Sequence, residues 1–241
     1  MDTKQYHRYA LACPTSMGVR ITPEDRMAVQ NSNLFYMQAT SAETNVLNVA
    51  SSLGRECLVL TKFVKDSPVA DFIKRQLRAR NIRFEGLDVE QGGPWGYRHQ
   101  FNIADSGFGL RAPRVWNDRA GEVGRTLCIE DFDIDRIFGQ EGIDILHLSG
   151  LIAAMSHETT QCCLALAKAA NSTVRSFRLT STTVRRSGRG ARRSSPPRSA
   201  RSRLLPMCSS ATRRTSSSAS VFKVLRRAGK ICPPKSSPSR V

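Results

Sequence analysis

The chain has 241 residues and a formal net charge of +17, with 37 Lys and Arg against 20 Asp and Glu. Residues 1–170 hold 19 of the basic and all 20 acidic residues, so the charge comes from residues 171–241, which hold 18 basic residues and no acidic one. No apolar run approaches the roughly 20 residues that a membrane span needs, and residues 1–8 lack the apolar core of a signal peptide.

These features predict a cytoplasmic protein without a membrane partner. The seven cysteines include no Cys-x-x-Cys pair. This spacing argues against a structural zinc site or a disulfide framework and predicts free thiols.

Residues 9–20 form the first predicted strand, interrupted at Pro14. Small and polar residues then run into a helical stretch at residues 39–54. Its apolar residues recur at helical spacing and predict a buried face, at Val46, Val49, Ala50 and Leu53. Residues 40–45 then lie at the helix start, where free N–H groups could bind an oxygen-rich ligand. The alternative is an ordinary capped core helix.

Strands and helices alternate after this stretch. Strands are predicted at residues 57–63, 82–89 and 142–150. One helix has Ser67 as N-cap and Pro68 at N1, with a buried stripe at Val69, Phe72, Ile73 and Leu77. Another is capped at Ser156. This alternation predicts a parallel sheet covered by helices, with ligands at the carboxyl ends of its strands, near His147 and Ser149.

Residues 91–124 interrupt the alternation. Between Tyr97 and Ile103 the pattern has period two, which places Arg98, Gln100 and Asn102 together on a predicted solvent-exposed face. Such a segment suits a lid over a pocket, or a small antiparallel flap that only covers core.

Five motifs in order resemble the N-terminal part of the ribokinase-like (PfkB-type) carbohydrate kinases, in particular the 2-keto-3-deoxygluconate kinase branch. The resemblance covers residues 8–170. The motifs are Gly18-Val-Arg-Ile-Thr-Pro, Asn45-Val-x-x-x-Ala-x-x-Leu-Gly54, Val115-Trp-Asn-Asp-Arg-Ala120, Glu130-Asp-Phe-Asp-Ile and Leu146-His-Leu-Ser-Gly-Leu151.

The resemblance implies a three-layer α/β/α fold with a parallel sheet and a small β lid, incomplete at the C-terminus. It implies ATP-dependent phosphorylation of a sugar or keto-deoxy sugar acid, with Mg²⁺, and allows a homodimer through the lid. The implied substrate contacts are Ser16, Thr40, Ser41, Glu43, Asn45, Tyr97, Arg98, Gln100, Asn117 and Arg119.

Among these, Arg119 is the candidate for a carboxylate, because a guanidinium grips a carboxylate bidentately. Thr40-Ser41 replaces the family's usual Gly-Gly, and Thr15-Ser16 stands where many members have Gly-Glu or a nearby Asp, so the identity of the sugar stays open. The family's C-terminal Gly-x-Gly-Asp motif, which supplies the base and the anion hole, does not occur in the sequence. We therefore predict no catalytic base or metal ligand, and an inactive chain.

Residues 171–241 are rich in Arg, Ser, Thr and Pro and are predicted to be disordered. Two explanations are open. The basic segment could bind nucleic acid electrostatically, on a sugar-fold protein without catalytic activity. Alternatively, the reading frame slips near Ala170, because shifted readings of residues 179–190 and 205–216 permit strings that suit the same kinase branch. The second explanation leaves the last helix without a following strand, and predicts a poorly stable body.

Overall fold

The computed structural model describes residues 7–173 and 176–180. Its main sheet is parallel, with the strand order β11-β10-β1-β4-β6. These strands are β1 (Tyr9–Pro14), β4 (Cys57–Leu60), β6 (Ile82–Glu85), β10 (Ile143–Ser149) and β11 (Ser176–Thr180).

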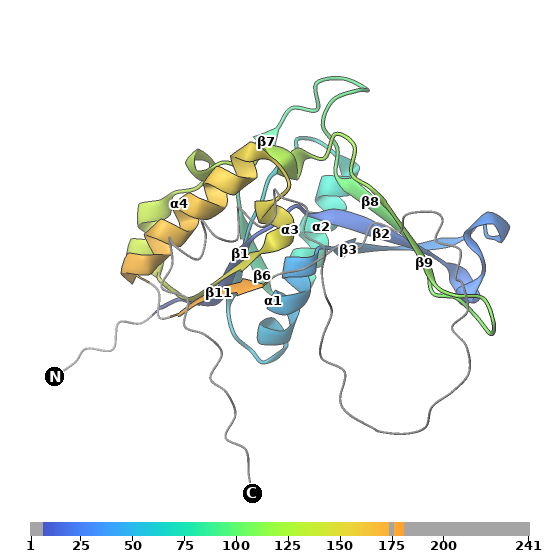
Figure 1. Ribbon diagram of the computed structural model, residues 1–241, viewed down its shortest axis with the longest axis horizontal. Coiled ribbons are helices and arrows are strands. Elements are labelled where there is room, and N and C mark those ends of the chain that lie inside the picture. The colour runs from blue at the N-terminus through green and yellow to red at the C-terminus, as the bar shows by residue number, and fades with distance from the viewer. Residues whose placement is uncertain (1–6, 174–175, 181–241) are drawn as a thin grey trace, which may run out of the picture.

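Helices cover both faces of this sheet. They are α1 (Ala42–Ser52), α2 (Pro68–Ala79) and α4 (His157–Thr173). Successive residues of a strand point to opposite faces: Leu11 and Cys13 pack with α1 and α2, whereas Ala12 packs with α4. The result is the three-layer α/β/α architecture expected from the sequence (Figure 1).

A second sheet forms the lid, with the order β3-β2-β8-β9, and projects from the main sheet in Figure 1. Its strands are β2 (Gly18–Pro23), β3 (Phe35–Thr40), β8 (Gln100–Asp105) and β9 (Arg114–Asp118). Half of the lid therefore precedes residues 91–124. The single strand predicted at residues 9–20 is wrong, because the chain leaves the main sheet after Pro14 and enters the lid at Gly18. Strand β3 was not predicted.

Shorter elements connect these layers. Strands β5 (Phe63–Val64) and β7 (Asp88–Val89) pair with each other, apart from the main sheet. The strand predicted at residues 82–89 is interrupted at Gly86, which has φ +146° and lies where a Cβ would meet the Thr61 carbonyl. Helix α3 (Gly150–Ala153) follows β10. The remaining turns are η1 (Glu24–Arg26), η2 (Val29–Asn31), η3 (Val123–Thr126), η4 (Ile129–Asp131) and the π-helix η5 (Asp135–Glu141).

Helix α2 begins as predicted; of its predicted buried stripe, Ile73 and Leu77 are fully buried and Val69 and Phe72 are half-buried. Ser67 caps it by accepting a hydrogen bond from the Ala70 N–H, and Pro68 occupies the first turn. Helix α4 also begins after the predicted cap Ser156, whose Oγ accepts from the Thr159 N–H at 3.1 Å.

The predicted buried face of α1 is wrong. Val46, Val49 and Leu53 are 42%, 65% and 76% exposed, and the helix instead buries Glu43, Thr44 and Leu47. Bonds from Glu43 to two strand ends fix this rotation, so the apolar stripe faces away from the main sheet. An apolar stripe of this kind is what a further layer of structure would cover.

The expectation that the last helix lacks a following strand is also wrong. Helix α4 continues to Thr173, and β11 pairs in parallel with β10, from Ile145 opposite Ser176 to Ser149 opposite Thr180. The rest of the segment predicted to be disordered, residues 181–241, lies outside the described residues.

Two further findings concern the described residues. None of their helices is both long and apolar enough to cross a bilayer. Their five cysteines, Cys13, Cys57, Cys128, Cys162 and Cys163, are free thiols as predicted. Cys208 and Cys232 lie outside the described residues.

The exposed stripe of α1 generates a prediction. Replacing Val49 and Leu53 together by Gln should lower both the binding of a hydrophobic fluorescent dye and the aggregated fraction, because these side chains face water. The melting temperature should stay unchanged. Leu47→Gln is the matched control and should destabilise the fold strongly, since Leu47 is fully buried. A large drop in melting temperature for the double variant would show that the stripe is buried in solution.

Candidate functional site

A narrow recess lies where the carboxyl ends of β1 and β10 meet the start of α1, the lid and α3. Five of the ten predicted contacts line it: Ser16, Ser41, Glu43, Gln100 and Arg119. Ala42, Leu151, Ile152 and Met155 complete the wall. The free volume is about 10 Å³, room for about one water molecule. A sugar can therefore enter only if the lid moves away from α1 and α3.

Ser41 closes the start of α1. Its Oγ accepts a hydrogen bond from the Thr44 N–H at 2.9 Å, and its own N–H donates to Thr44 Oγ1 at 3.1 Å. This reciprocal capping box satisfies two groups that a helix start otherwise leaves open. The predicted free N–H groups at residues 40–45 are thus partly used by the protein itself.

Glu43 joins three elements beneath the recess. Its side chain is buried, at 2% exposure, in the first turn of α1. Thr15 Oγ1 donates to Glu43 Oε2 at 2.6 Å, and Ser149 Oγ donates to Oε1. The carboxylate therefore fixes α1 to the segment after β1 and to the end of β10.

Gln100 and Ser16 contribute the polar wall on the lid side. Gln100 Nε2 donates to the Ser16 carbonyl at 3.2 Å, but Gln100 Oε1 is buried without a hydrogen-bond partner among the described residues. The Ser16 hydroxyl lies beside the Glu122 carboxylate and helps to hold the pKa of Glu122 down. Gln100 lies against Gly18, where a Cβ would stand 2.0 Å from Gln100 Cγ. A buried polar atom without a partner costs about 1–3 kcal/mol, so Gln100 Oε1 suits a hydroxylated ligand.

Arg119 enters the recess as an ion pair. Its Nη1 lies 3.3 Å from both carboxylate oxygens of Glu122. Burial raises the pKa of Glu122, while the Arg119 charge opposes that shift. Sequence reasoning missed Glu122, because a glutamate in a loop carries no periodic signal.

The other five predicted contacts do not line the recess. Thr40 is buried opposite Gly18 in the lid, and Asn45, Tyr97 and Asn117 are exposed. Arg98 is held by the lid itself, since its Nε donates to the Ala120 carbonyl at 2.7 Å and its Nη2 pairs with Asp118.

The predicted solvent-exposed face of β8 is wrong. Gln100 and Asn102 are 2% and 7% exposed, whereas Phe101 and Ile103 on the other face are half-buried. Period two separates the two faces of a strand but does not show which of them meets the body: Gln100 lines the recess rather than facing water.

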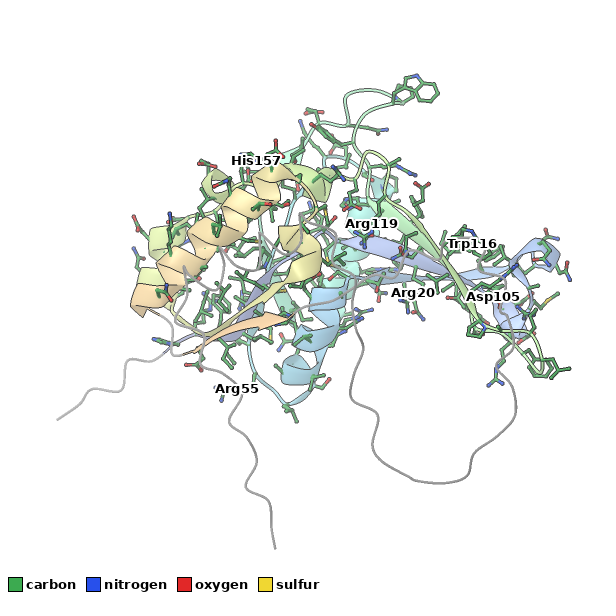
Figure 2. The ribbon with its side chains drawn as sticks, viewed as in Figure 1. Arg20, Arg55, Asp105, Trp116, Arg119 and His157 are labelled. Atoms are coloured by element: carbon green, nitrogen blue, oxygen red, sulfur yellow. The ribbon has the colours of Figure 1, made fainter. Side chains whose placement is uncertain are left out.

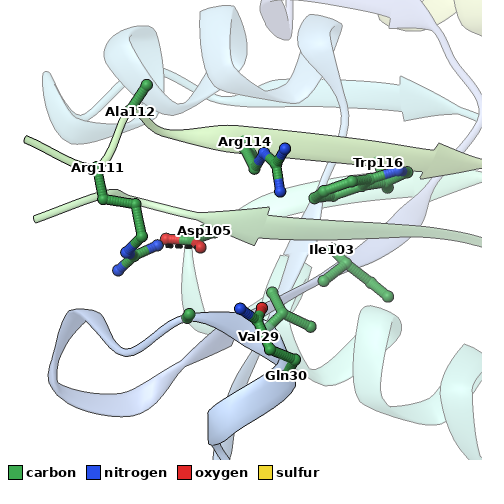
Figure 3. Close-up of a pocket in the computed structure, with 9 residues that line it drawn as sticks. Val29, Gln30, Ile103, Asp105, Arg111, Ala112, Arg114 and Trp116 are labelled. Atoms are coloured by element: carbon green, nitrogen blue, oxygen red, sulfur yellow. Dashed lines mark hydrogen bonds and ion pairs between the residues drawn. The ribbon is translucent and has the colours of Figure 1, made fainter.

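A larger pocket of about 490 Å³ lies at the free end of the lid (Figure 3). Asp105 pairs with Arg111, whose hydrogen bond lowers the pKa of Asp105, and the Arg114 guanidinium lies 5.4 Å from the centre of the Trp116 ring. None of the predicted contacts lines this pocket. Size alone therefore does not select the candidate site.

His99 holds the base of the lid. The Val64 N–H donates to His99 Nε2 at 3.3 Å, so the ring hydrogen sits on Nδ1 and donates to the Met17 carbonyl at 3.1 Å. Burial lowers the pKa of His99. It also lowers the pKa of His147 in β10, while the charge of Glu43 opposes that shift.

The described residues do not fit Mg²⁺ and ATP. They contain no group of three or more His, Cys, Asp or Glu side chains that could hold a metal ion. The start of α1, which could otherwise bind a phosphate, is occupied by the Ser41 cap and the buried Glu43. The recess offers hydrogen bonds and one guanidinium, which suit a polar organic ligand.

Comparison with solved structures identifies the fold of this chain. The sequence matches no protein-family model and no curated protein. Its fold is nevertheless that of the ribokinase-like (PfkB) carbohydrate kinases, which confirms the predicted resemblance and fold class at the level of structure.

Three neighbours illustrate the match. A 2-dehydro-3-deoxygluconokinase from Thermotoga maritima is 22% identical, with a TM-score of 0.61 over 69% of this chain and 49% of its own. A PfkB family carbohydrate kinase from Listeria grayi is 18% identical, with a TM-score of 0.62 over 73% and 52%. An uncharacterized sugar kinase from Pyrococcus horikoshii in complex with ATP is 14% identical, with a TM-score of 0.53 over 69% and 52%. The chain thus spans about half the length of these structures.

The buried, neutral His99 predicts how the stability of the fold depends on pH. Because its folded pKa lies below the usual 6.5, the unfolded chain binds a proton first as the pH falls. The contribution of neutral His99 to the free energy of unfolding is therefore complete above pH 6.5, and it is lost as the pH falls toward the pKa of His99 in the folded chain. Chemical denaturation of the wild type at pH 7.5 and 5.5 should show this loss, and His99→Gln should show a smaller one.

His157→Gln is the matched control. His157 is exposed at the start of α4 and should leave the loss in place. An equal loss of stability in His99→Gln and the wild type would contradict the assignment of the ring hydrogen to Nδ1.

Proposed function

We propose that this chain carries the sugar-binding part of a cytoplasmic, ATP-dependent carbohydrate kinase, acting on a sugar or a keto-deoxy sugar acid. The observation that supports this most is the convergence of Ser16, Ser41, Glu43, Gln100 and Arg119 on one recess, at the carboxyl edge of a parallel sheet.

In this proposal the lid opens and closes over the sugar. Gln100 Oε1 accepts a hydrogen bond from a sugar hydroxyl, which satisfies a buried atom, and the Ser16 hydroxyl bonds to the sugar beside Glu122. Arg119 donates to ligand oxygens through the nitrogens that Glu122 leaves available. Glu43 positions α1, since both its oxygens are engaged. The other five predicted contacts would reach the sugar only with the lid in a different position. They are Thr40, Asn45, Tyr97, Arg98 and Asn117.

ATP is the proposed phosphoryl donor, with Mg²⁺. The neighbour from Pyrococcus horikoshii, a sugar kinase in complex with ATP, supports this choice. Because the described residues do not fit these groups, we propose that the residues that bind them, and the catalytic base, belong to a part of the fold that this chain does not span. The chain as it stands is then inactive.

We also propose that residues after β11 are translated out of frame. The slip is proposed near Ala170, because shifted readings of residues 179–190 and 205–216 suit the kinase branch. The pairing of β11 with β10 supports a slip later than this, within β11.

A second copy is the proposed partner for the free end of the lid. Leu34 and Trp116 are more than half exposed there. An apolar surface of this kind would be covered in a homodimer through the lid.

A gene with the frame restored tests the proposed activity. The longer protein should release ADP from ATP only when a keto-deoxy sugar acid is present, whereas the 241-residue chain should show no turnover. Arg119→Gln should lower kcat/KM about tenfold to a hundredfold, because bonds to charged groups contribute about 1.5–3 kcal/mol.

Arg83→Gln is the matched control, since Arg83 lies in β6 and its side chain is 57% exposed. It should leave kcat/KM unchanged. A restored protein that is inert with sugars and sugar acids would contradict the proposal. Binding of RNA by the 241-residue chain, with a steep salt dependence, would then favour a non-catalytic protein with a nucleic-acid-binding segment.

A further inference from the structure

The pocket at the free end of the lid is a cavity of its own, apart from the recess. The strand register sets Ile103 of β8 opposite Trp116 of β9, and Asp105 opposite Arg114. These four side chains share one face of the lid, because alternate residues of a strand point the same way. Gln100, which lines the recess, is an odd number of residues from Ile103 and points to the other face. Pocket and recess therefore lie on opposite faces of the lid.

Bonds of Asp105 hold the walls of this pocket together. Asp105 is 4% exposed; its Oδ1 accepts a hydrogen bond from the Gly107 N–H at 2.8 Å, and its Oδ2 pairs with Arg111. Arg111 also donates through Nη2 to the Arg26 carbonyl of η1, at 2.5 Å. These bonds tie β8 to η1 and to the loop before β9. The pocket is therefore formed without a ligand, as small-molecule sites usually are.

The lining of the pocket is mostly apolar and suits a flat ligand. The apolar side chains are those of Ala28, Val29, Ile103, Ala112 and Trp116. Figure 3 shows Val29 and Gln30 of η2 across the pocket from Arg114 and Trp116 of β9. The volume of about 490 Å³ lies within the range of about 300–1,000 Å³ that small-molecule sites have. The exposed indole of Trp116 offers a surface on which an aromatic ring can stack. The pocket thus fits a ligand with a small aromatic part.

Arg114 gives this pocket its charge. It is the charged lining residue with which no carboxylate of the described residues pairs, since Arg111 and Gly107 already engage the Asp105 carboxylate. Its guanidinium lies 5.4 Å from the centre of the Trp116 ring, close enough for a cation–π contact that holds it beside the pocket. A guanidinium binds a carboxylate through two parallel hydrogen bonds. The pocket therefore favours a ligand with an acidic group next to its aromatic part.

We propose that the pocket at the free end of the lid is a binding site for a small aromatic carboxylate, with the ring on Trp116 and Ile103 and the carboxylate on Arg114. Figure 2 shows Asp105 and Trp116 toward the free end of the lid, whereas Arg119 of the recess lies nearer the body. The ligand is therefore not the sugar, and the inference does not depend on the proposed sugar-binding function. A bound ligand joins η2 to β8 and β9, which stabilises the lid by mass action.

Isothermal titration of the complete 241-residue chain tests the inference, with naphthylacetate, its neutral amide and acetate as probes. The chain should bind naphthylacetate at least about tenfold more tightly than the amide, because only the acid pairs with Arg114. Acetate, which lacks the ring, should not bind measurably. Arg114→Gln should remove the preference for the acid and leave binding of the amide unchanged. Arg83→Gln is the matched control, since it removes an exposed charge from β6 and should bind all three probes as the wild type does.

A second variant fills the pocket without changing its charge. Val29→Trp places a large side chain in the cavity, and because Val29 is only half-buried the melting temperature should stay close to that of the wild type. Naphthylacetate and its amide should both lose binding in this variant. The inference is overturned by binding that Val29→Trp retains, by an unchanged preference for the acid in Arg114→Gln, or by a wild-type chain that binds neither ring compound.

Trp116 also belongs to the surface proposed for a second copy. Every residue that lines the pocket comes from one chain, so a monomer should bind the probe. Sedimentation of the titrated samples checks this, and binding confined to dimers would overturn the claim that one chain forms the site. None of these outcomes bears on the sugar-binding function, because the recess lies on the other face of the lid.

Discussion

Glu43 lies in the first turn of α1 with its side chain buried, and each of its carboxylate oxygens accepts a hydroxyl hydrogen bond, one from Thr15 and one from Ser149. A buried carboxylate is tolerated only when it is bonded in this way. The helix dipole adds to the effect, because a negative charge is favoured at a helix start. These bonds draw α1, the end of β1 and the end of β10 to one point, and the recess opens directly above it.

The same bonds explain why α1 shows its apolar stripe to water. Once Glu43 and Thr44 face the sheet, Val49 and Leu53 must point away from it. The matched solved structures are about twice as long as the region they share with this chain. A helix face stays uncovered where a further part of such a fold would otherwise pack on it. The hydrogen bonds of Glu43 therefore determine both the rotation of α1 and the position of the recess, at the cost of leaving apolar residues of α1 exposed.

Elements that depend on neighbouring residues could be predicted from the sequence, whereas features that depend on bonds between distant residues could not. Helix α2 was found with its cap Ser67 and its stripe because both depend on residues within one helix. The alternation of strands and helices gave the parallel sheet for the same reason. The rotation of α1 and the ion pair of Arg119 with Glu122 depend on residues far apart or without periodicity. The predicted contacts Ser16, Gln100 and Arg119 reached the recess, whereas Arg98 is held by the lid.

Equilibrium unfolding of Glu43→Gln in urea tests this account most directly. Gln replaces one of the two carboxylate oxygens by an N–H donor, so either the Thr15 or the Ser149 hydroxyl loses its acceptor. The account predicts a loss of about 1–3 kcal/mol in the free energy of unfolding. It also predicts that Ser149→Ala costs less in the Glu43→Gln background than in the wild type. Identical unfolding curves for the wild type and Glu43→Gln would contradict the claim that this carboxylate holds the site together.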